Sequence, residues 1–197
     1  MAALGLALGA VYVSQQARGV RAEAQRLLGF SPERLEHVTA VAGVAASGVG
    51  VVQADEIELL VAAAWLHDIG YASEVADTGF HPLDGARHLR SIGASERLCR
   101  LIANHTHAWV EAEARGLADT LAEEFPAEHS PIADALTYAD LTTGPTGDRV
   151  AVEDRLAEIL ERYPAGHVVH ESIRRASAEL IATVRRVEAR MAAAHPR

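Results

Sequence analysis

The chain has 197 residues, of which 49% are apolar and 5% aromatic, and its formal net charge is −9 at pH 7. Its length suits one domain with a sizeable core. The acidic balance disfavours a nucleic-acid polymer as partner, because there is no basic stripe to displace counterions from phosphates. The single cysteine, Cys99, excludes an internal disulfide and a thiolate-rich metal site, and it fits a reducing cytoplasm.

The chain begins with an apolar segment that lacks a basic start and is too short to span a bilayer. We interpret residues 1–15 as a disordered leader or a mis-assigned start, with a cleaved signal peptide as the alternative. The remaining residues, 16–197, are assigned to a single helical domain, located in the cytoplasm and without a membrane partner.

Abundant Ala, Glu and Arg, with few β-branched runs, predict an all-α fold. The first helix is expected over 16–30. Ser31-Pro32-Glu33 then marks a new start, with Ser as the N-cap and Pro at the first helical position. The second helix has a buried face with His37 beside it, formed by Leu35, Val38, Val41, Ala42 and Ala45.

The third helix opens at Asp55-Glu56 and leads into the sequence WLHDIG. Its apolar residues from Ile57 to Ala64 follow the i, i+3, i+4, i+7 spacing of one buried helix face. Continued along the same helix, this spacing places His67 and Asp68 at the end of the buried face. Burying an unpaired charge costs several kcal/mol, on the order of 5 or more. The pattern therefore predicts that this pair is bound to other charged groups or to metal.

Two later helices repeat the arrangement. Ser95 begins a helix whose apolar face ends at His105, and Ser130 begins one whose apolar face ends at Asp140. Between the third helix and these, Pro82 starts a helix that ends near Gly93, with His81 as its cap. Since chance placements of His and Asp fall mostly on solvent-exposed faces, the repetition indicates one shared buried site.

The remaining chain is expected to complete the bundle. A short helix is predicted around Leu117 to Leu121, and a turn-rich loop, TTGPTG, follows Asp140. The C-terminal helices are predicted over 152–194. The last one repeats apolar residues near heptad spacing, which buries it against the bundle or against a second subunit in a homodimer.

Six residues form the candidate metal site: His37, His67, Asp68, His81, His105 and Asp140. Imidazoles and carboxylates suit Fe, Mn, Co, Ni or Zn. Six ligands exceed what one catalytic ion needs, whereas two ions about 3.5–4 Å apart, bridged by Asp68 and a hydroxide, would use them all. Such a pair would hold a phosphoryl oxygen while the hydroxide attacks in line.

The order of these residues resembles the H…HD…D motif of the HD-domain superfamily of metal-dependent phosphohydrolases. His37, His67-Asp68 and Asp140 match it over roughly 34–150, and His81 in HPLDGA and His105 in NHT match the two extra histidines of the binuclear subgroup. The resemblance implies a helical bundle with two divalent ions, Fe or Mn first, between core helices. It further implies hydrolysis of a phosphate ester or anhydride in a small molecule or nucleotide.

Within that superfamily, the chain is most similar locally to bacterial hydrolases of diadenosine tetraphosphate. The similar segments are HPLDGA, Ile102 to Thr106 and YAD, whereas the loop after Asp140 differs from the loop in those hydrolases. Tyr71 stands where related phosphodiesterases have Lys, and no GYP triplet occurs, which argues against the HD-GYP type. Two alternatives remain open from the sequence: an HD-fold di-iron oxygenase with the same six ligands, and a non-catalytic module that binds a nucleotide or partner.

Three further residues are candidate substrate contacts. Arg87 follows Leu83 by one helical turn and could bind a phosphate in bidentate fashion, with a surface position as the alternative. Thr142 and Thr143 could donate hydroxyls to the substrate or stabilise their loop. Bound ions, rather than basic side chains, would then neutralise most of the charge of a small phosphorylated substrate.

Overall fold

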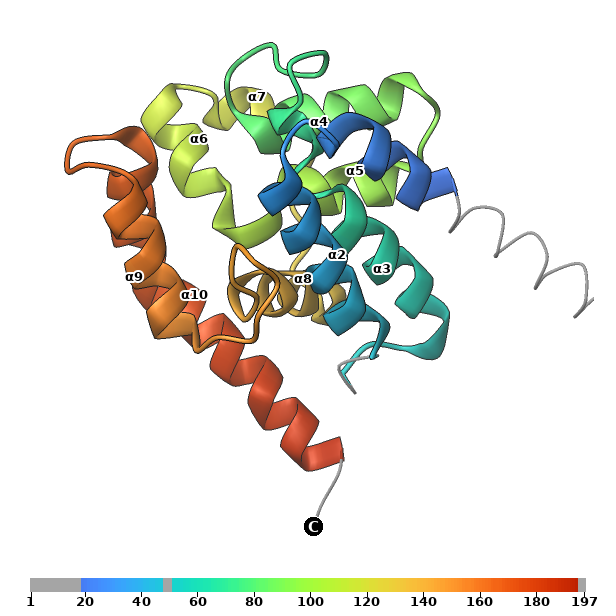
Figure 1. Ribbon diagram of the computed structural model, residues 1–197, viewed down its shortest axis with the longest axis vertical. Helices are drawn as coiled ribbons and strands as arrows, with labels where there is room; N and C mark the ends of the chain where they lie inside the picture. The colour runs from blue at the N-terminus through green and yellow to red at the C-terminus, as the bar shows by residue number, and fades with distance from the viewer. Residues whose placement is uncertain (1–18, 48–50, 195–197) are drawn as a thin grey trace, which may run out of the picture.

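The computed structural model describes residues 19–47 and 51–194, so the leader predicted over 1–15 lies outside the described residues. Within them the chain is all-α, and its strand-like pairing is limited to an isolated antiparallel bridge between Thr143 and Arg149. Residues 19–28 are helical, and the helices that follow are labelled in Figure 1. They are α2 (Pro32–Ala46), α3 (Ile57–Leu66), α4 (His81–Ser91), α5 (Glu96–Ala103), α6 (Trp109–Arg115), α7 (Ala118–Glu124), α8 (Pro131–Leu141), α9 (Val152–Arg162) and α10 (Val168–Ala194).

Helix α8 lies at the centre of the bundle. It packs against α2 and α3 on one side and against α9 and α10 on the other (Figure 1). Helices α4 and α5 pack against each other, and α5 also contacts α3. Every residue of α8 from Ala135 to Leu141 is buried, a run of seven in a helix of eleven. This fits a helix enclosed by neighbours on several sides.

The predicted helix starts are largely confirmed. The hydroxyl of Ser95 accepts a hydrogen bond from the backbone N–H of Leu98, and the hydroxyl of Ser130 accepts one from Ala133. Both are N-cap bonds of the expected kind. At Ser31 the backbone is extended, as at an N-cap, but its side chain makes no capping bond.

Two helices end earlier than the sequence predicts. Helix α3 ends at Leu66, so His67 and Asp68 lie in the turn after it rather than on its last turn. Helix α5 likewise ends at Ala103, and His105 begins a short 3₁₀ turn. The continuous helical count was therefore wrong at these points. Local bonds from the histidine rings to preceding carbonyls, described below, stabilise the turns in place of a further helical turn.

Helix α6 was not predicted, because the segment from Trp109 to Arg115 is too polar to show a clear apolar period. Its buried contacts come from only Val110 and Ala112, and Gly116 ends it in the left-handed conformation with φ of 70°. The predicted short helix is α7, which begins one residue later than expected and extends to Glu124.

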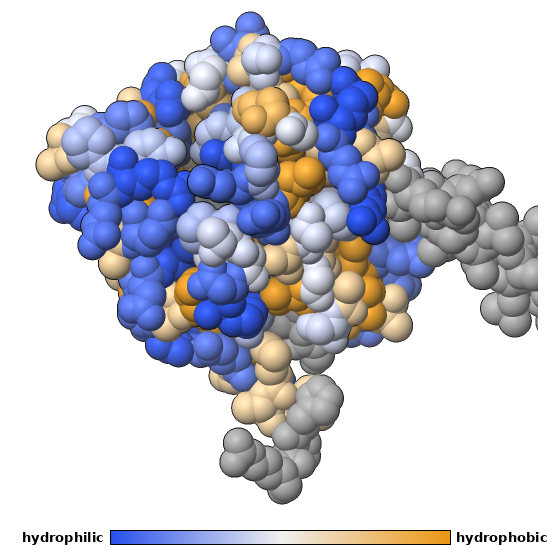
Figure 2. All heavy atoms as spheres, in the orientation of Figure 1, coloured by the Kyte–Doolittle hydropathy of each residue, from blue (hydrophilic) through white to orange (hydrophobic). Residues whose placement is uncertain are grey.

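The core is built mainly from Ala, Leu, Val and Ile, with Phe80 and Phe125 as its largest fully buried side chains. Cys99 is also fully buried, as expected for a small apolar residue. The view in Figure 2 is largely hydrophilic over α9 and carries more apolar atoms over α2 and α3. Among residues 19–47 and 51–194, no helix has the combined length and apolar character that crossing a bilayer would require.

Candidate metal centre

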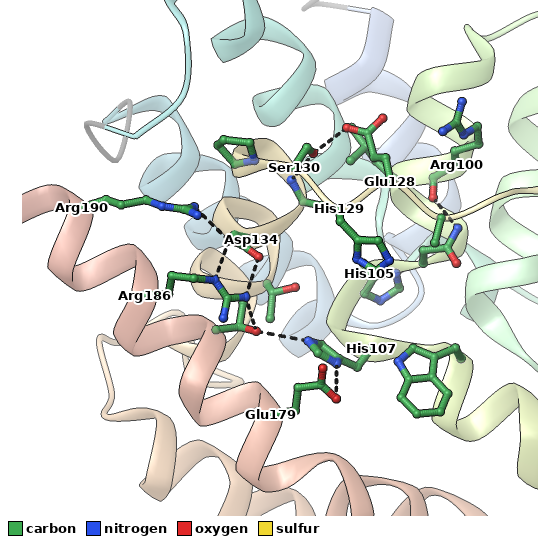
Figure 3. Close-up of a pocket in the computed structure, with 18 residues that line it drawn as sticks. Arg100, His105, His107, Glu128, His129, Ser130, Asp134, Glu179, Arg186 and Arg190 are labelled. Atoms are coloured by element: carbon green, nitrogen blue, oxygen red, sulfur yellow. Dashed lines mark hydrogen bonds and ion pairs between the residues drawn. The ribbon is translucent and has the colours of Figure 1, made fainter.

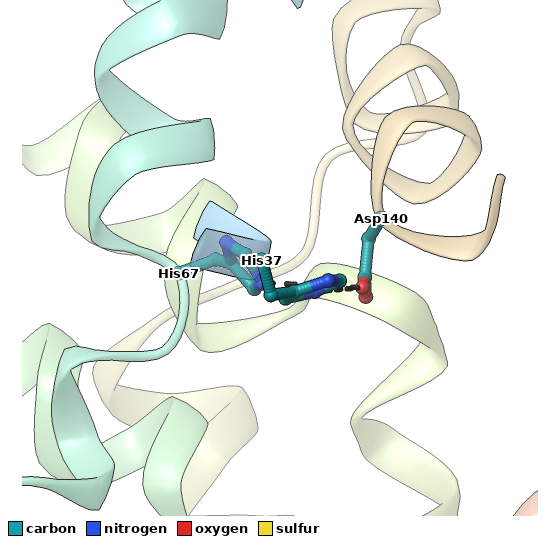
Figure 4. Close-up of side chains that lie close together, drawn as sticks. All are labelled: His37, His67 and Asp140. Carbon is teal, nitrogen blue, oxygen red and sulfur yellow. Dashed lines mark hydrogen bonds and ion pairs between the residues drawn. The ribbon is translucent and has the colours of Figure 1, made fainter. Parts of the chain in front are cut away.

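The six residues predicted as metal ligands lie together in two adjacent groups. His37, His67 and Asp140 form one group, and Asp68, His81 and His105 form the other; within each group the potential ligand atoms lie within 4.8 Å of one another. Figure 4 shows the first group, in which side chains from α2, from the turn after α3 and from α8 point toward a common centre. The site therefore exists only where these separate segments meet.

Three of the histidine rings are oriented by the same kind of bond. In each, Nδ1 lies within hydrogen-bond distance of a backbone carbonyl: His37 to Gly144 at 3.0 Å, His67 to Ala64 at 2.8 Å and His105 to Ile102 at 2.6 Å. A carbonyl only accepts hydrogen bonds, so Nδ1 carries the proton and the lone pair remains on Nε2. This is how protein metal sites usually fix the ligating nitrogen of histidine.

In the first group, the lone pairs converge on carboxylate oxygens. Nε2 of His37 lies 3.1 Å from Oδ1 of Asp140, and Nε2 of His67 lies 3.9 Å from the same oxygen. Nε2 of His67 is buried and has no hydrogen-bond partner among the described residues. Acceptors that face one another in a buried space repel unless a proton or a cation lies between them, so this donor set fits a metal ion.

In the second group too, imidazole nitrogens and a carboxylate oxygen face one another. Nε2 of His81 lies 3.3 Å from Nε2 of His105 and 3.5 Å from Oδ1 of Asp68. That carboxylate oxygen is also 3.6 Å from Nε2 of His67, which belongs to the first group. Asp68 therefore lies between the two groups and is the residue able to serve both.

The electrostatic environment favours the protonation states that metal ligands need. Burial lowers the pKa of His67 and of His81, and the nearby carboxylates offset this only in part. Burial opposes ionisation of Asp68 and Asp140 too, yet neighbouring histidines hold the pKa of both carboxyls below the usual range, with Arg34 adding to the effect at Asp68. At neutral pH these imidazoles are neutral and these carboxylates are charged, as metal binding requires.

The pKa of His37 is shifted in the opposite direction from those of His67 and His81. Burial acts to lower its pKa, but the hydrogen bond and charge of Asp140 raise it overall. A proton on Nε2 of His37 would thus bridge to Asp140. A cation between the two side chains would take the place of that proton.

Gly70 of the WLHDIG sequence lies so close to the backbone of His81 that only a residue without a side chain fits there. A Cβ atom at this position would collide with the backbone carbonyl of His81, and one at Gly85 would lie 3.2 Å from the backbone nitrogen of Gly70. The turn after α3 and the start of α4 thus pack backbone to backbone. This contact places His81 beside His67 and Asp68.

The loop before His81 is organised by Asp84. Its buried carboxylate accepts hydrogen bonds from the backbone N–H groups of Asp77, Thr78 and Gly79 at 3.0–3.1 Å, and from the hydroxyl of Thr78 at 2.7 Å. Asp84 therefore has a structural role in the HPLDGA segment, because it fixes the chain that leads into α4.

Sequence reasoning did not find Arg34 or the role of Tyr71. Nη1 of Arg34 lies 2.5 Å from Oδ2 of Asp68, and its guanidinium carbon lies 3.6 Å from the centre of the Tyr71 ring. That ring stacks on His81, with 4.0 Å between ring centres. The available signal was the spacing of Arg34 and His37, which are three residues apart and hence on one face of α2.

Two other residues at the site also escaped the sequence reasoning. The hydroxyl of Thr106 donates to Oδ2 of Asp140 at 2.5 Å, which leaves Oδ1 directed at His37 and His67. Arg155 of α9 is only 7% exposed and lines the cleft in front of the two groups. No sequence signal marks Arg155, because its position depends on how α9 packs against the rest of the bundle.

The three predicted substrate contacts are not brought to this cleft. Arg87 binds Glu124 of α7 through its Nε and Nη2, at 2.9 and 2.5 Å. The hydroxyls of Thr142 and Thr143 donate to the carbonyls of Tyr138 and Ala139, at 2.6 and 2.7 Å, and so close the last turn of α8. Their bonds to nearer partners fit the alternatives offered by the sequence, a surface position for Arg87 and stabilisation of the loop by Thr142 and Thr143.

The cleft itself has a volume of about 110 Å³. It opens onto Asp68, His81, His105 and Asp140, and helices α9 and α10 form its outer wall. The side chains from these two helices that line it are Arg155, Ile159, Arg162, Val169 and Ile173.

The buried His and Asp side chains between the helices of this all-α bundle could hold metal ions. Comparison with protein families gives a match to the HD domain over residues 34–144, more than half of the chain. The chain belongs to the HD-domain family, whose members form a superfamily of metal-dependent hydrolases and bind divalent metal ions. Neither a curated protein nor a solved structure shows significant similarity to the chain.

Proposed function

We propose that the protein is a metal-dependent phosphohydrolase that cleaves a phosphate ester or anhydride in a small molecule or nucleotide. The observation that carries the proposal is the position of Asp68 between two sets of converging lone pairs. When bound there, two divalent ions would lower the pKa of a water molecule to near neutrality and neutralise phosphoryl oxygens.

The residues of the two groups would hold the ions. His37, His67 and Asp140 supply ligands for one, and Asp68, His81 and His105 for the other. Oδ1 of Asp68 faces histidines of both groups, while Arg34 binds its Oδ2. Asp68 is therefore the carboxylate that would orient the reacting centre, and Arg34 positions it.

The lining of the cleft supports an anionic substrate. Three arginines reach it, Arg34 from α2 and Arg155 and Arg162 from α9. Arg155 lines the cleft, and its buried Nε has no hydrogen-bond partner among the described residues, which leaves this arginine a donor beyond those bound to Glu158. Arginine is well suited to this task because its planar fork matches phosphate geometry.

The size of the cleft supports a substrate whose phosphoryl end enters while the remainder stays near the rim. A volume of about 110 Å³ is well below the roughly 300 Å³ at which sites that enclose a whole drug-sized ligand begin. The apolar side chains of Ile159, Val169 and Ile173 would then contact the organic part of the substrate.

The proposal is tested by metal analysis of the purified protein, combined with turnover of a panel of phosphomonoesters, nucleotides and dinucleoside tetraphosphates. We expect roughly two equivalents of divalent metal, and phosphate or nucleotide release that a chelator abolishes and Fe or Mn restores. Metal-loaded protein without turnover of any panel member would contradict the proposal. Oxygen uptake by the reduced iron form would instead indicate the oxygenase alternative.

A further inference from the structure

A second and larger cavity, of about 330 Å³, lies behind the metal centre. Figure 3 shows it between α8 and α10 on one side and the turn from His105 to His107 on the other. Its volume falls at the lower end of the range, about 300–1,000 Å³, that is typical of small-molecule sites. The function proposed above makes no use of it.

The 3₁₀ turn His105–His107 is the wall between the two cavities. His105 lines both, Thr106 lines the metal cleft and His107 lines the larger cavity. Thr106 and His107 have φ values of 51° and 55°, a left-handed conformation that non-glycine residues adopt only at a cost of about 1 kcal/mol or more each. Such strain is concentrated at functional segments of proteins.

His107 lines the cavity, and one of its ring nitrogens lacks a hydrogen-bond partner among the described residues. Its Nε2 lies 3.2 Å from the hydroxyl of Thr183, but its buried Nδ1 has no hydrogen-bond partner among the described residues. Glu179 is the nearest carboxylate to Nδ1, at 3.6 Å, which is beyond hydrogen-bond distance. A buried polar atom of this kind is normally satisfied by a ligand or an ordered water.

Three arginines and three carboxylates carry the formal charges on the cavity wall. Arg186 and Arg190 of α10 both bind the single carboxylate of Asp134, at 2.9–3.0 Å (Figure 3). The other lining charges are Arg100, Glu179 and Glu128, and Glu128 is already paired with Arg97 from outside the cavity. Arg186 and Arg190 thus share one carboxylate, and their remaining N–H groups can donate to an anionic ligand.

Two aromatic rings also line the cavity. Trp109 is 45% exposed although it is a large apolar side chain, and it lines the cavity, as does His129, which is labelled in Figure 3. Exposed indole and imidazole rings bind flat ring systems by stacking. A lining that combines such rings with the guanidinium groups of Arg186 and Arg190 matches a molecule that carries a planar ring and a negative charge.

We propose that this cavity is a binding site for a small organic anion with a planar ring, separate from the metal centre. The ring stacks on Trp109 and the anionic group binds Arg190 and Arg186. A ligand bound here contacts the same turn that carries His105 toward the metal centre.

The test is a titration with adenosine monophosphate that follows the fluorescence of Trp109. The chain has two tryptophans, so the Trp65→Phe variant makes Trp109 the sole emitter. We expect saturable quenching by the monophosphate, with weaker binding of adenosine and of inorganic phosphate. Arg190→Gln should weaken binding of the monophosphate about tenfold, through loss of a hydrogen bond to a charged group. Arg185→Gln is the matched control on the same helix, because Arg185 pairs with Glu153 and Glu188.

The metal cleft is a competing location for the nucleotide, and Asp68→Asn separates the two. This variant, introduced into the same Trp65→Phe background, should retain the quenching because Asp68 does not line the larger cavity. The proposal is overturned by absence of saturable quenching, by equal affinity for adenosine and its monophosphate, or by equal effects of Arg190→Gln and Arg185→Gln. It is also overturned if binding is lost in Asp68→Asn but survives Arg190→Gln.

Discussion

The bonds from Nδ1 to backbone carbonyls decide the chemistry of His37, His67 and His105. Each bond fixes the tautomer, so each ring in its neutral form presents a lone pair to the site rather than an N–H group. Asp140 is oriented in the same manner, since Thr106 binds one of its oxygens and leaves the other for the histidines. The first group is thus preorganised by neighbours that are not themselves ligands.

Asp68→Asn is expected to abolish turnover and reduce the bound metal. An amide of the same shape cannot supply the charge that lies between the two groups, so we expect activity to fall by about 10³-fold or more. Metal content by elemental analysis and initial rates on the best substrate of the panel measure the two effects. Asp77→Asn, at a carboxylate that is 80% exposed, is the control and should behave as wild type.

At the scale of secondary-structure elements, the docking of the turn after α3 onto the start of α4 determines where His81 lies. Gly70 and Gly85 allow the two backbones to meet. The glycine that closes the WLHDIG sequence is therefore a packing requirement, and it acts on the site through the position of His81.

Gly70→Ala is expected to destabilise the protein by about 1–3 kcal/mol and to weaken metal binding, because the new methyl group displaces the backbone of His81. Gly43→Ala is the control, and it should change the free energy of unfolding in the opposite direction. Gly43 lies in α2, and a Cβ added to it would have nothing within 4 Å, so alanine there should stabilise the helix by about 0.5–1 kcal/mol. Urea denaturation of both variants gives the comparison, and a stable Gly70→Ala protein with wild-type metal content would contradict the packing argument.

Helix α9 lies beyond the family match, which ends at residue 144, yet it supplies Arg155 and Arg162 to the cleft. Substrate preference in this protein is therefore expected to depend on a helix outside the matched region. Glu158 pairs with both arginines, so removal of one still leaves the carboxylate with a partner.

Arg155→Gln is expected to raise KM roughly tenfold with unchanged metal content, because it removes a charged donor from the cleft but no metal ligand. Steady-state kinetics with metal analysis on the same preparation separate the two effects. Arg174→Gln, at an exposed arginine that pairs with Glu171 on α10, is the matched control. An unchanged KM in Arg155→Gln would show that Arg155 does not contact the substrate.

At the scale of the whole molecule, ion pairs join the outer helices to the bundle. Glu23, in the helix over 19–28, binds Arg26 at 2.8 Å and His88 of α4 at 3.0 Å. The bonds from Arg26, joined by His88, lower the pKa of Glu23 to about 2. This helix is thus tied to the body of the protein by a carboxylate that stays charged far into the acid range.

Because the pKa of Glu23 is lowered in the folded state, its contribution to the free energy of unfolding depends on pH in a predictable way. Glu23 contributes its stabilisation above the unfolded pKa of about 4.3, and the contribution is lost as the pH falls toward about 2. Glu23→Gln should therefore be less stable than wild type at pH 7, with a difference that closes as the pH falls from about 5 to about 2. Urea unfolding of both proteins at several pH values measures this, and a difference that grows on acidification would contradict it.

Much of the fold could be predicted because its signals are local. The all-α class follows from composition, and the starts at Ser95 and Ser130 follow from capping residues whose side-chain bonds are present. The C-terminal helices, predicted over 152–194, are α9 and α10 within these limits. Helix α6 and the early ends of α3 and α5 were missed, because ring-to-carbonyl bonds and tertiary packing stabilise the chain there more than propensity does.

The sequence by itself determined which residues could bind metal, because His and Asp at the ends of apolar faces must find partners in a buried environment. It did not determine the role of Arg87, Thr142 or Thr143, each of which is bound by a nearer group in the fold. Only the tertiary structure decided which nitrogen of His37, His67 and His105 faces the site, and that α9 brings Arg155 to the cleft. These depend on contacts between residues far apart in the chain, and such contacts arise from packing rather than from local spacing.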